Sequence, residues 1–150
     1  MEKVTELRRK LKELFDKQRI GVLSTQKKNR PYASLVAFAV TDDLKSFVFA
    51  TPRATRKYSN IMASSRAALL IDNRSNKLSD FRKAMAVTVV GTVRELRKSK
   101  KSRLIQLYTH KHSHLEDFIK SPTCAVLCLE AEILHIVDQF QHVVELHLNK

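Results

Sequence analysis

The stretch T-P-R-A-T-R-K-Y-S-N-I, residues 51–61, directly follows the apolar run S-F-V-F-A, residues 46–50. An apolar run of this length is typical of a buried strand, and the residues after it predict a helix over residues 54–64. Thr51 can cap this helix, and Pro52 can occupy its first turn, where proline is tolerated. The sequence therefore predicts a sharp corner between a buried strand and a helix.

This corner carries two hydroxyls and three cations, at Thr51, Arg53, Thr55, Arg56 and Lys57. The first turn of a helix is the positive end of its dipole, so acidic side chains are favoured there and cations are not. A bound anion reverses that preference, because free backbone N–H groups, hydroxyls and guanidinium groups all bind phosphate oxygens. The corner thus indicates a phosphate site, with a solvated basic helix surface as the alternative.

Hydrophobic periodicity on both sides of the corner predicts a mainly β protein with peripheral helices. An amphipathic helix is expected over residues 2–18, and two helical pieces lie between residues 104 and 119. The expected strands cover residues 20–25, 32–41, 46–51, 67–72, 85–96, 125–137 and 143–148. This pattern fits a closed or partly closed, mostly antiparallel barrel better than a βαβ array. No linker or repeat interrupts it, so we expect one domain over residues 1–150.

Composition limits the classes of function. The 28 Lys and Arg residues against 15 Asp and Glu residues give a formal net charge of +13, which favours anionic partners. Only Gly21 and Gly91 are present, which excludes the glycine-rich loops that bind dinucleotides or triphosphates. No apolar run reaches the roughly 18 residues of a membrane span. The charged N-terminus lacks the apolar segment of a signal peptide, so we expect a cytoplasmic location.

The two cysteines, Cys124 and Cys128, lie on one expected strand. Four residues of strand separate them by roughly 13 Å, which is too far for a disulfide. We therefore expect two buried thiols in a reducing compartment.

The corner resembles the phosphate site of the pyridoxamine-phosphate-oxidase-like flavoproteins, in which T-x-x-x-[ST]-R-K lies between a strand and a helix. The segments R-P-Y-A-S-L-V-A-F (residues 30–38) and A-V-T-V-V-G-T-V-R-E-L (residues 86–96) also resemble strands of that family. The resemblance covers residues 15–148 without rearrangement. It implies an FMN-binding split β-barrel of the mostly antiparallel, Greek-key type.

The resemblance also implies which residues hold the cofactor. Thr51, Thr55, Arg56 and Lys57 fall on the positions that bind the FMN phosphate. Residues of the second strand would lie along the flavin ring, and the polar loop after residue 72 would add ring contacts. The ring-binding residues implied in this way are Ser34, Leu35, Val36, Asn73 and Arg74.

The C-terminal segment departs from the oxidase itself. That enzyme grips pyridoxamine phosphate with an arginine–leucine–histidine arrangement, whereas this chain has Glu145, Leu146 and His147. The glutamine that precedes the glycine-marked strand in the oxidase is also missing, with Ala86 and Thr88 at the candidate positions. A glutamate repels a phosphate dianion, so we expect a substrate other than pyridoxamine phosphate.

The leading hypothesis is an FMN-dependent oxidoreductase that acts on an unidentified small molecule. No side chain is an evident acid or base, so no catalytic residue is named. The same fold with deazaflavin or haem, and a flavin-binding sensor or store, are alternatives. A basic nucleic-acid-binding module is a further alternative, although only 7% of the residues are aromatic and tryptophan is absent.

A homodimer is implied by the resemblance, since that family builds its flavin site between subunits. The apolar faces of residues 32–40 and 47–49 also favour a homodimer, because their apolar area exceeds what we expect one small barrel to bury.

The histidines invite a metal or haem reading. His110 and His114 would share one helix face, with His112 between them, but no H-E-x-x-H pattern occurs and we expect no metal. Some relatives of the family bind haem through a histidine near the C-terminus, which makes His147 a candidate ligand. An exposed side chain is the simpler expectation for each histidine.

Overall fold

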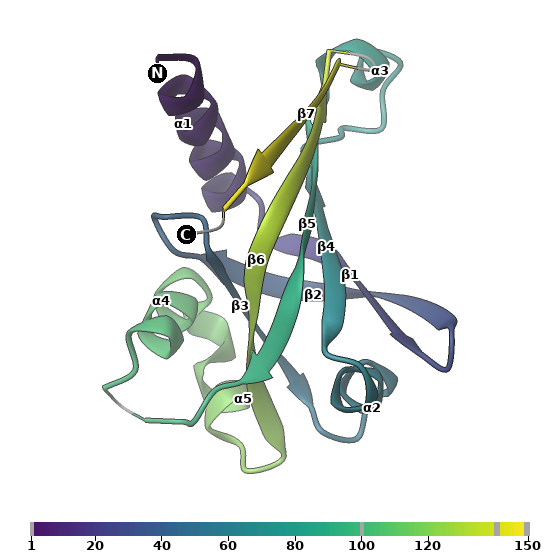
Figure 1. Cartoon of the computed structure of the whole chain (residues 1–150). Coiled ribbons are helices and arrows are strands. Elements are labelled where there is room, and N and C mark those ends of the chain that lie inside the picture. The colour runs from purple at the N-terminus through teal and green to yellow at the C-terminus, as the bar shows by residue number, and fades with distance from the viewer. Residues whose placement is uncertain (1, 100, 140–141, 149–150) are drawn as a thin grey trace.

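A computed structural model describes residues 2–99, 101–139 and 142–148 of the chain. Seven antiparallel strands form one sheet in the order β3-β2-β1-β4-β5-β6-β7, and β3 also pairs with β6. That pairing closes six strands into a barrel and leaves β7 added on the outside of β6 (Figure 1). The prediction of a mostly antiparallel split barrel is confirmed.

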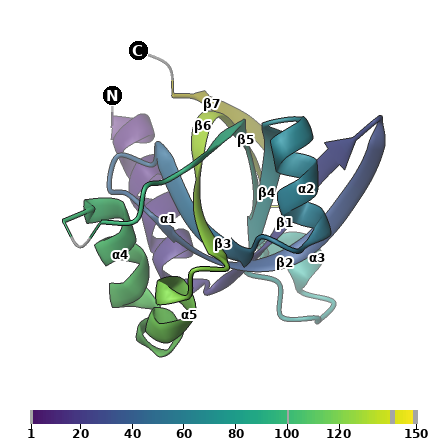
Figure 2. The same cartoon turned by 90° about the horizontal axis from the view of Figure 1, so that it is seen from below.

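The strands are β1 (Ile20–Lys27), β2 (Arg30–Val40), β3 (Ser46–Pro52), β4 (Arg66–Asp72), β5 (Ala86–Glu95), β6 (Cys124–Asp138) and β7 (His142–His147). The helices are α1 (Glu2–Lys17), α2 (Arg56–Ala63), α3 (Asp80–Lys83), α4 (Arg103–Lys111), the short 3-10 helix η1 (Ser113–Leu115) and α5 (Glu116–Lys120). Seen along the barrel, α2 lies on one side of its open end, and α4 and α5 lie on the opposite side (Figure 2). None of the described helices is long and apolar enough to cross a membrane.

Two apolar clusters hold the fold together. The larger fills the barrel and includes Phe38, Phe47 and Phe49, which are fully buried. The smaller lies between α4, α5 and the outer face of the barrel, where Val48 is fully buried. Both faces of residues 47–49 are therefore covered within one chain. For β3 the expected apolar excess is absent, because α4 and α5 cover its outer face. On β2, Tyr32 and Leu35 are exposed, so that part of the expectation stays.

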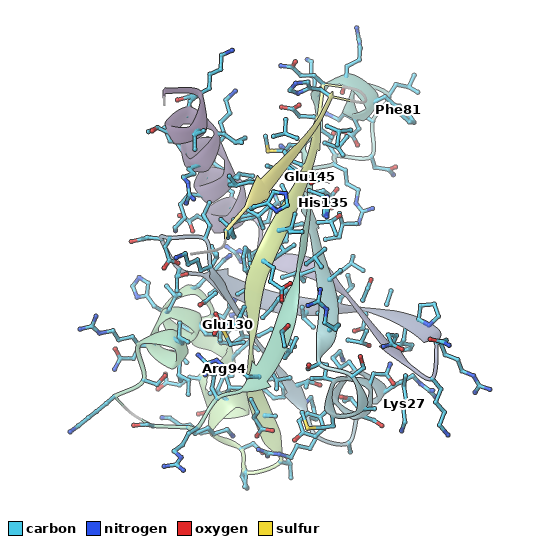
Figure 3. All side chains as sticks on the ribbon, viewed as in Figure 1. Lys27, Phe81, Arg94, Glu130, His135 and Glu145 are labelled. Carbon is cyan, nitrogen blue, oxygen red and sulfur yellow. The ribbon has the colours of Figure 1, made fainter. Side chains whose placement is uncertain are left out.

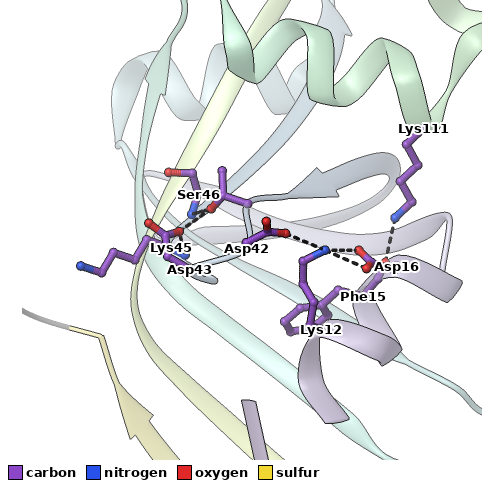
Figure 4. A network of polar contacts seen from close by, with 9 residues as sticks. Lys12, Phe15, Asp16, Asp42, Asp43, Lys45, Ser46 and Lys111 are labelled. Atoms are coloured by element: carbon purple, nitrogen blue, oxygen red, sulfur yellow. Dashed lines mark hydrogen bonds and ion pairs between the residues drawn. The ribbon is translucent and has the colours of Figure 1, made fainter. Parts of the chain in front are cut away.

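Helix α1 packs on the barrel through its apolar stripe. Leu11, Leu14 and Phe15 are buried, and the Phe15 ring meets Phe47 edge-on with 5.1 Å between ring centroids. The amine of Lys12 binds Asp16 in the same helix at 2.6 Å and lies 3.4 Å from Asp42 in the β2–β3 turn (Figure 4). Apolar burial thus provides the attachment, and exposed ion pairs on the outer face add little.

Backbone oxygens at the C-terminal end of α1 accept hydrogen bonds from a side chain of another helix. The amine of Lys111 in α4 donates to the backbone oxygens of Phe15 and Gln18, at 2.8 and 2.6 Å. The same amine lies 4.1 Å from the centroid of the Phe38 ring. Burial lowers the pKa of Lys111 to about 8. One cation therefore satisfies carbonyls that the end of a helix leaves unpaired.

The prediction that both cysteines are buried thiols is confirmed. Cys124 and Cys128 are free thiols buried in β6. Burial raises the pKa of Cys128 to about 12, so this thiol is held in its unreactive protonated form.

Two local predictions were wrong. The polar loop between β4 and β5 contains helix α3, where the Asp80 carboxylate accepts hydrogen bonds from the backbone N–H groups of Ser75 and Asn76. His110 and His114 do not share a helix face, because α4 ends at Lys111.

The expectation that every histidine is exposed was also wrong, because His112 is buried. Its Nε2 lies 2.7 Å from the Phe38 oxygen and must carry the proton, since a carbonyl only accepts. Burial lowers the pKa of His112 below 6.5.

Gly91 marks a close approach of two strands. The β5–β6 register shifts at Val90 and Gly91, where β6 carries Glu132 as one extra residue. A Cβ atom at Gly91 would lie 1.9 Å from the Glu130 oxygen. At Gly21 the atoms nearest to such a Cβ are Leu69 Cδ1 at 3.0 Å and the Leu70 oxygen at 3.1 Å, so the shift required is much smaller.

We expect Gly91→Ala to lower the free energy of unfolding by about 3 kcal/mol or more, because a backbone oxygen cannot move aside locally. The matched Gly21→Ala change should cost about 1 kcal/mol. Urea unfolding of both variants measures the difference. Equal losses would show that β5 and β6 are not held this closely.

Acid should weaken the fold through His112. The folded protein holds this ring neutral, so its contribution is complete above pH 6.5 and falls as the pH is lowered below that value. His112→Leu should lower the free energy of unfolding by about 1–3 kcal/mol at pH 7.5, because the Phe38 carbonyl loses its donor.

The measurement is urea unfolding at pH 7.5 and pH 5.5, with the exposed His110→Gln as control. The Leu variant should lose less stability on acidification than the control does. An identical loss would mean that His112 takes up its proton in the folded state as easily as in the unfolded chain.

Candidate functional site

The barrel is split between β2 and β3. Strand β3 pairs with β6 over its whole length, Ser46 to Pro52, but with β2 only over Phe38–Val40. Residues 30–37 of β2 pair with β1 on one side, and no described strand pairs with them on the other. This open edge faces the point where β3 leads into α2.

Helix α2 begins later than the sequence predicted. Strand β3 continues through Pro52, and the N-cap is Thr55, whose hydroxyl accepts from the Tyr58 N–H at 3.3 Å. Thr51 is 1% exposed and does not cap the helix. Its hydroxyl lies 2.8 Å from that of Thr55, which in turn donates to the Pro52 oxygen. The cap prediction therefore had the right residue type at the wrong threonine.

The three cations of this corner have different surroundings. Arg53 is occupied by the protein itself: it donates to Glu95 at 2.6 Å and to the Pro122 oxygen at 2.8 Å. Tyr58 donates to the other oxygen of the same carboxylate at 2.7 Å, and this hydrogen bond lowers the pKa of Glu95. Arg53 thus joins α2 to β5 and to the start of β6, and its charge is balanced.

Arg56 and Lys57 form no ion pair with any described residue. They are the first two residues of α2, so their backbone N–H groups belong to the unpaired end of the helix. The Arg56 guanidinium lies 5.7 Å from the centroid of the Tyr32 ring, which stands on the open edge of β2. This contact bridges the split, and it leaves the charge of Arg56 without an acidic partner.

A cleft of about 540 Å³ lies at this bridge. Its lining comes from α2 and from the β1–β2 hairpin: Lys27, Lys28, Arg30, Pro31, Tyr32, Arg56 and Asn60. Asn60 is buried and donates to Thr25 at 3.0 Å, which fixes α2 against β1. Four of the lining residues are cations and none is acidic, so the cleft can bind an anion.

The predicted ring-contact residues of β2 differ in exposure. Ser34 Oγ is buried and has no hydrogen-bond partner. Leu35 is 67% exposed, whereas Val36 is buried in the core. A ligand along this edge could therefore meet the Ser34 hydroxyl and the Leu35 side chain, but only the backbone of Val36.

Asn73 and Arg74 lie elsewhere. They follow β4, whose first residue is near the end of α2 and whose last residue is about 20 Å further along the strand. Figure 3 shows Lys27 at the tip of the hairpin and Phe81, in the loop that contains Asn73 and Arg74, at the far end of the molecule. Asn73 accepts from the Met85 N–H at 2.7 Å, and Arg74 pairs with Asp72. Within one chain these two residues are not brought together with Arg56.

The C-terminal histidine belongs to a third location. On β7, Glu145 lies 3.2 Å from His147 and 3.5 Å from His135, which is on β6. Figure 3 shows Glu145 and His135 side by side. Among the described residues, no group of three or more His, Cys, Asp or Glu side chains is arranged to hold a metal ion.

The family model described as pyridoxamine 5'-phosphate oxidase matches residues 7–138, which is most of the chain. The chain belongs to the pyridoxamine 5'-phosphate oxidase family. No curated protein sequence matches it.

Solved structures from several organisms share the fold. The heme binding protein from Mycobacterium smegmatis superposes with a TM-score of 0.82 at 14% identity, over 94% of this chain and 57% of that one. General Stress Protein 26 from Bacillus anthracis gives 0.70 at 17% identity, over 95% and 98%. A FAD-binding protein from Mesorhizobium loti gives 0.67 at 18% identity, over 85% and 89%. The chain thus spans little more than half of the mycobacterial protein, and these similarities concern the fold.

Sequence reasoning missed the hairpin side of the cleft. Lys27, Lys28 and Arg30 lie in Q-K-K-N-R-P, between the expected strands over residues 20–25 and 32–41. The signal was present, because a two-residue turn between paired strands places its flanking residues side by side. What the sequence did not reveal is that this hairpin lies against α2, with Lys27 donating to Ser59 at 3.2 Å.

Arg53 is held by contacts within the protein, whereas Arg56 forms no ion pair with any described residue, and this difference can be tested. Arg53→Ala should lower the free energy of unfolding by about 1–3 kcal/mol, since two backbone oxygens and Glu95 lose a charged donor. Arg56→Ala should change it by less than about 1 kcal/mol, because an exposed side chain loses only a cation–π contact with Tyr32. Thermal and urea unfolding of the two variants compare them directly. A larger loss for Arg56→Ala would contradict this assignment.

Proposed function

We propose that this protein binds FMN in the split between β2 and β3 and uses it to oxidise or reduce a small molecule. The observation that carries the proposal is the pair Arg56 and Lys57, two cations without an ion pair among the described residues, at the start of α2. Free N–H groups and unpaired cations together favour a phosphate group. Membership in the pyridoxamine 5'-phosphate oxidase family and the fold shared with a FAD-binding protein support a flavin phosphate.

The two threonines have different parts in this proposal. Thr55 is half-buried beside the first N–H groups of α2, where its hydroxyl can turn toward a phosphate oxygen. Thr51 is buried, so it supports the site through a hydrogen bond with Thr55, at 2.8 Å between the two hydroxyl oxygens. A direct bond from Thr51 to the phosphate, which the family resemblance implies, stays a prediction.

The open edge of β2 fits the flavin ring. The Ser34 hydroxyl is a buried polar atom without a partner, and a ring atom of a ligand would supply one. The exposed Leu35 offers apolar contact. Bound FMN supplies hydride and single-electron transfer, whereas the chain orients the ring and shields it from water. No carboxylate or histidine lines the cleft, and its side chains that can exchange a proton are Tyr32, Lys27 and Lys28.

A homodimer would account for Asn73 and Arg74. These residues cannot reach the Arg56 corner of their own chain, which lies beyond the full length of β4. In a pair of chains arranged with opposite ends together, the loop of one copy would reach the flavin of the other. The proposal therefore assigns these two residues to the flavin site of a partner copy.

The substrate is proposed to differ from pyridoxamine phosphate. Glu145 falls where the family resemblance places a cation in the oxidase, and its carboxylate lies 3.5 Å from His135 and 3.2 Å from His147. These histidines are exposed or half-buried on the outside of β6 and β7. A phosphate dianion near this carboxylate would be repelled.

The test is a titration of the protein with FMN, followed by flavin fluorescence. Each charge-assisted contact to the phosphate is worth roughly 1.5–3 kcal/mol, so Arg56→Ala and Lys57→Ala should each weaken binding about ten- to a hundredfold. Arg56→Lys should cost less than Arg56→Ala, because lysine keeps the charge but not the two-pronged contact.

Arg97→Ala is the matched control, since Arg97 is exposed and forms no ion pair among the described residues. If Arg56→Ala and Lys57→Ala bind FMN as well as the control does, the corner is only a basic surface. The absorption spectrum of the purified protein decides the cofactor, because flavin, deazaflavin and haem absorb at different wavelengths. A haem or deazaflavin spectrum would overturn the choice of FMN.

A further inference from the structure

The tip of the β1–β2 hairpin carries three cations that its own geometry disfavours. Lys27 and Arg30 lie directly opposite each other in the strand register, and like charges in that position repel. Lys28 and Asn29 form the turn between them, with φ angles of 52° and 61°. Glycine and asparagine suit this left-handed conformation, whereas lysine does not. Two local features therefore oppose the cations at this tip.

Nothing described in the structure offsets this cost. Lys28 and Arg30 form no ion pair with any described residue, and Lys27 donates only to the neutral hydroxyl of Ser59. The carboxylates of Glu95 and Glu132 pair with other cations, Arg53 and Arg66. A sequence that keeps unfavourable cations together without acidic partners is typical of a binding site.

The hairpin cations share their cleft with Arg56, but they are displaced from the start of α2. Lys27 reaches Ser59, which lies three residues beyond Arg56 and therefore about 4.5 Å further along the helix. The cleft between them holds about 540 Å³. A single phosphate at the first turn of α2 would leave the hairpin side of this space unfilled.

Charge leads to the same conclusion. The cleft is lined by four cations and no acid. A phosphate monoester such as that of FMN carries a charge of about −1.5 to −2 near pH 7. About two positive charges therefore stay unbalanced when one such group is bound.

We infer that Lys28 and Arg30, with Lys27, bind a second oxyanion of the phosphate type next to the phosphate of FMN, an inference that rests on the function proposed above. The second group comes either from a flavin dinucleotide, which carries two linked phosphates, or from a separate phosphorylated substrate. Both sources present the same chemistry to the hairpin, and binding measurements distinguish them.

The decisive variant is Lys28→Asn combined with Arg30→Gln. Asparagine suits the left-handed turn position and the second change removes a like-charge pair, so the variant should unfold at the same temperature as the parent or higher. Its affinity for the second oxyanion should nevertheless fall tenfold or more. The control is Lys101→Asn with Arg97→Gln, which removes the same charge from two exposed positions outside the cleft.

The measurement is calorimetric titration at fixed ionic strength with three ligands: FMN, FAD, and inorganic pyrophosphate added to FMN-loaded protein. We expect pyrophosphate to bind the FMN-loaded parent and the control, and to bind the hairpin variant at least tenfold more weakly. FMN affinity should change less than threefold. If the hairpin variant also loses affinity for FAD relative to FMN, the source is the dinucleotide. If the hairpin variant changes the affinities for FAD and FMN by the same factor, the source is a separate ligand.

Other results overturn the inference and identify which proposal has failed. Equal losses for FMN and pyrophosphate would mean that the hairpin belongs to the FMN phosphate site alone. FMN binding without any binding of pyrophosphate would exclude the second oxyanion site and leave the proposed function intact. Pyrophosphate binding that depends on the hairpin, in a protein that does not bind FMN, would reject the flavin and keep the oxyanion site. Binding of duplex DNA that depends on the hairpin, without pyrophosphate binding, would replace the site by a nucleic-acid surface.

Discussion

The unequal pairing of β3 is the constraint on which the rest of the structure depends. Seven residues of β3 pair with β6, and only three pair with β2. The long pairing closes the barrel around the phenylalanines of its core, and the short pairing leaves the edge of β2 open. The same strand then leads directly into α2. A buried core and an accessible corner thus arise from one strand, because its two neighbours leave it at different points.

Local patterns predicted most of the fold. Residues spaced by three and four identified α1, and Leu11, Leu14 and Phe15 are buried as that spacing requires. Long-range packing was beyond such patterns. The apolar outer face of β3 seemed to need another subunit, because no local signal indicates that α4 and α5 return to cover it. For the same reason His112 was taken for a surface residue, although its ring reaches the Phe38 carbonyl, 74 positions earlier in the chain.

The chemistry of the candidate site was predictable from the sequence, but the role of each residue was not. The cations at residues 53–57 indicated an anion site, yet the sequence could not show that Glu95, 42 positions later, neutralises Arg53. The roles of the two threonines depend on where β3 ends, and boundaries between elements are poorly encoded. The hairpin cations were visible as a basic turn, but only the contact between Lys27 and Ser59 shows that they face Arg56. The excess positive charge of the chain is therefore not spread evenly, because the carboxylates of β5 and β6 pair with Arg53, Arg66 and Arg94.

The capping of α1 by Lys111 has a consequence for the order in which the chain folds. The donor to the Phe15 oxygen, Lys111, lies 96 positions later in the chain, so α1 is synthesised long before its last turn can be completed. The partner of its apolar stripe, the barrel core, also needs the distant pairing of β3 with β6. An isolated helix of this length is only marginally stable in water. We therefore expect α1 to complete its last turn and attach to the barrel only after β3 has paired with β6.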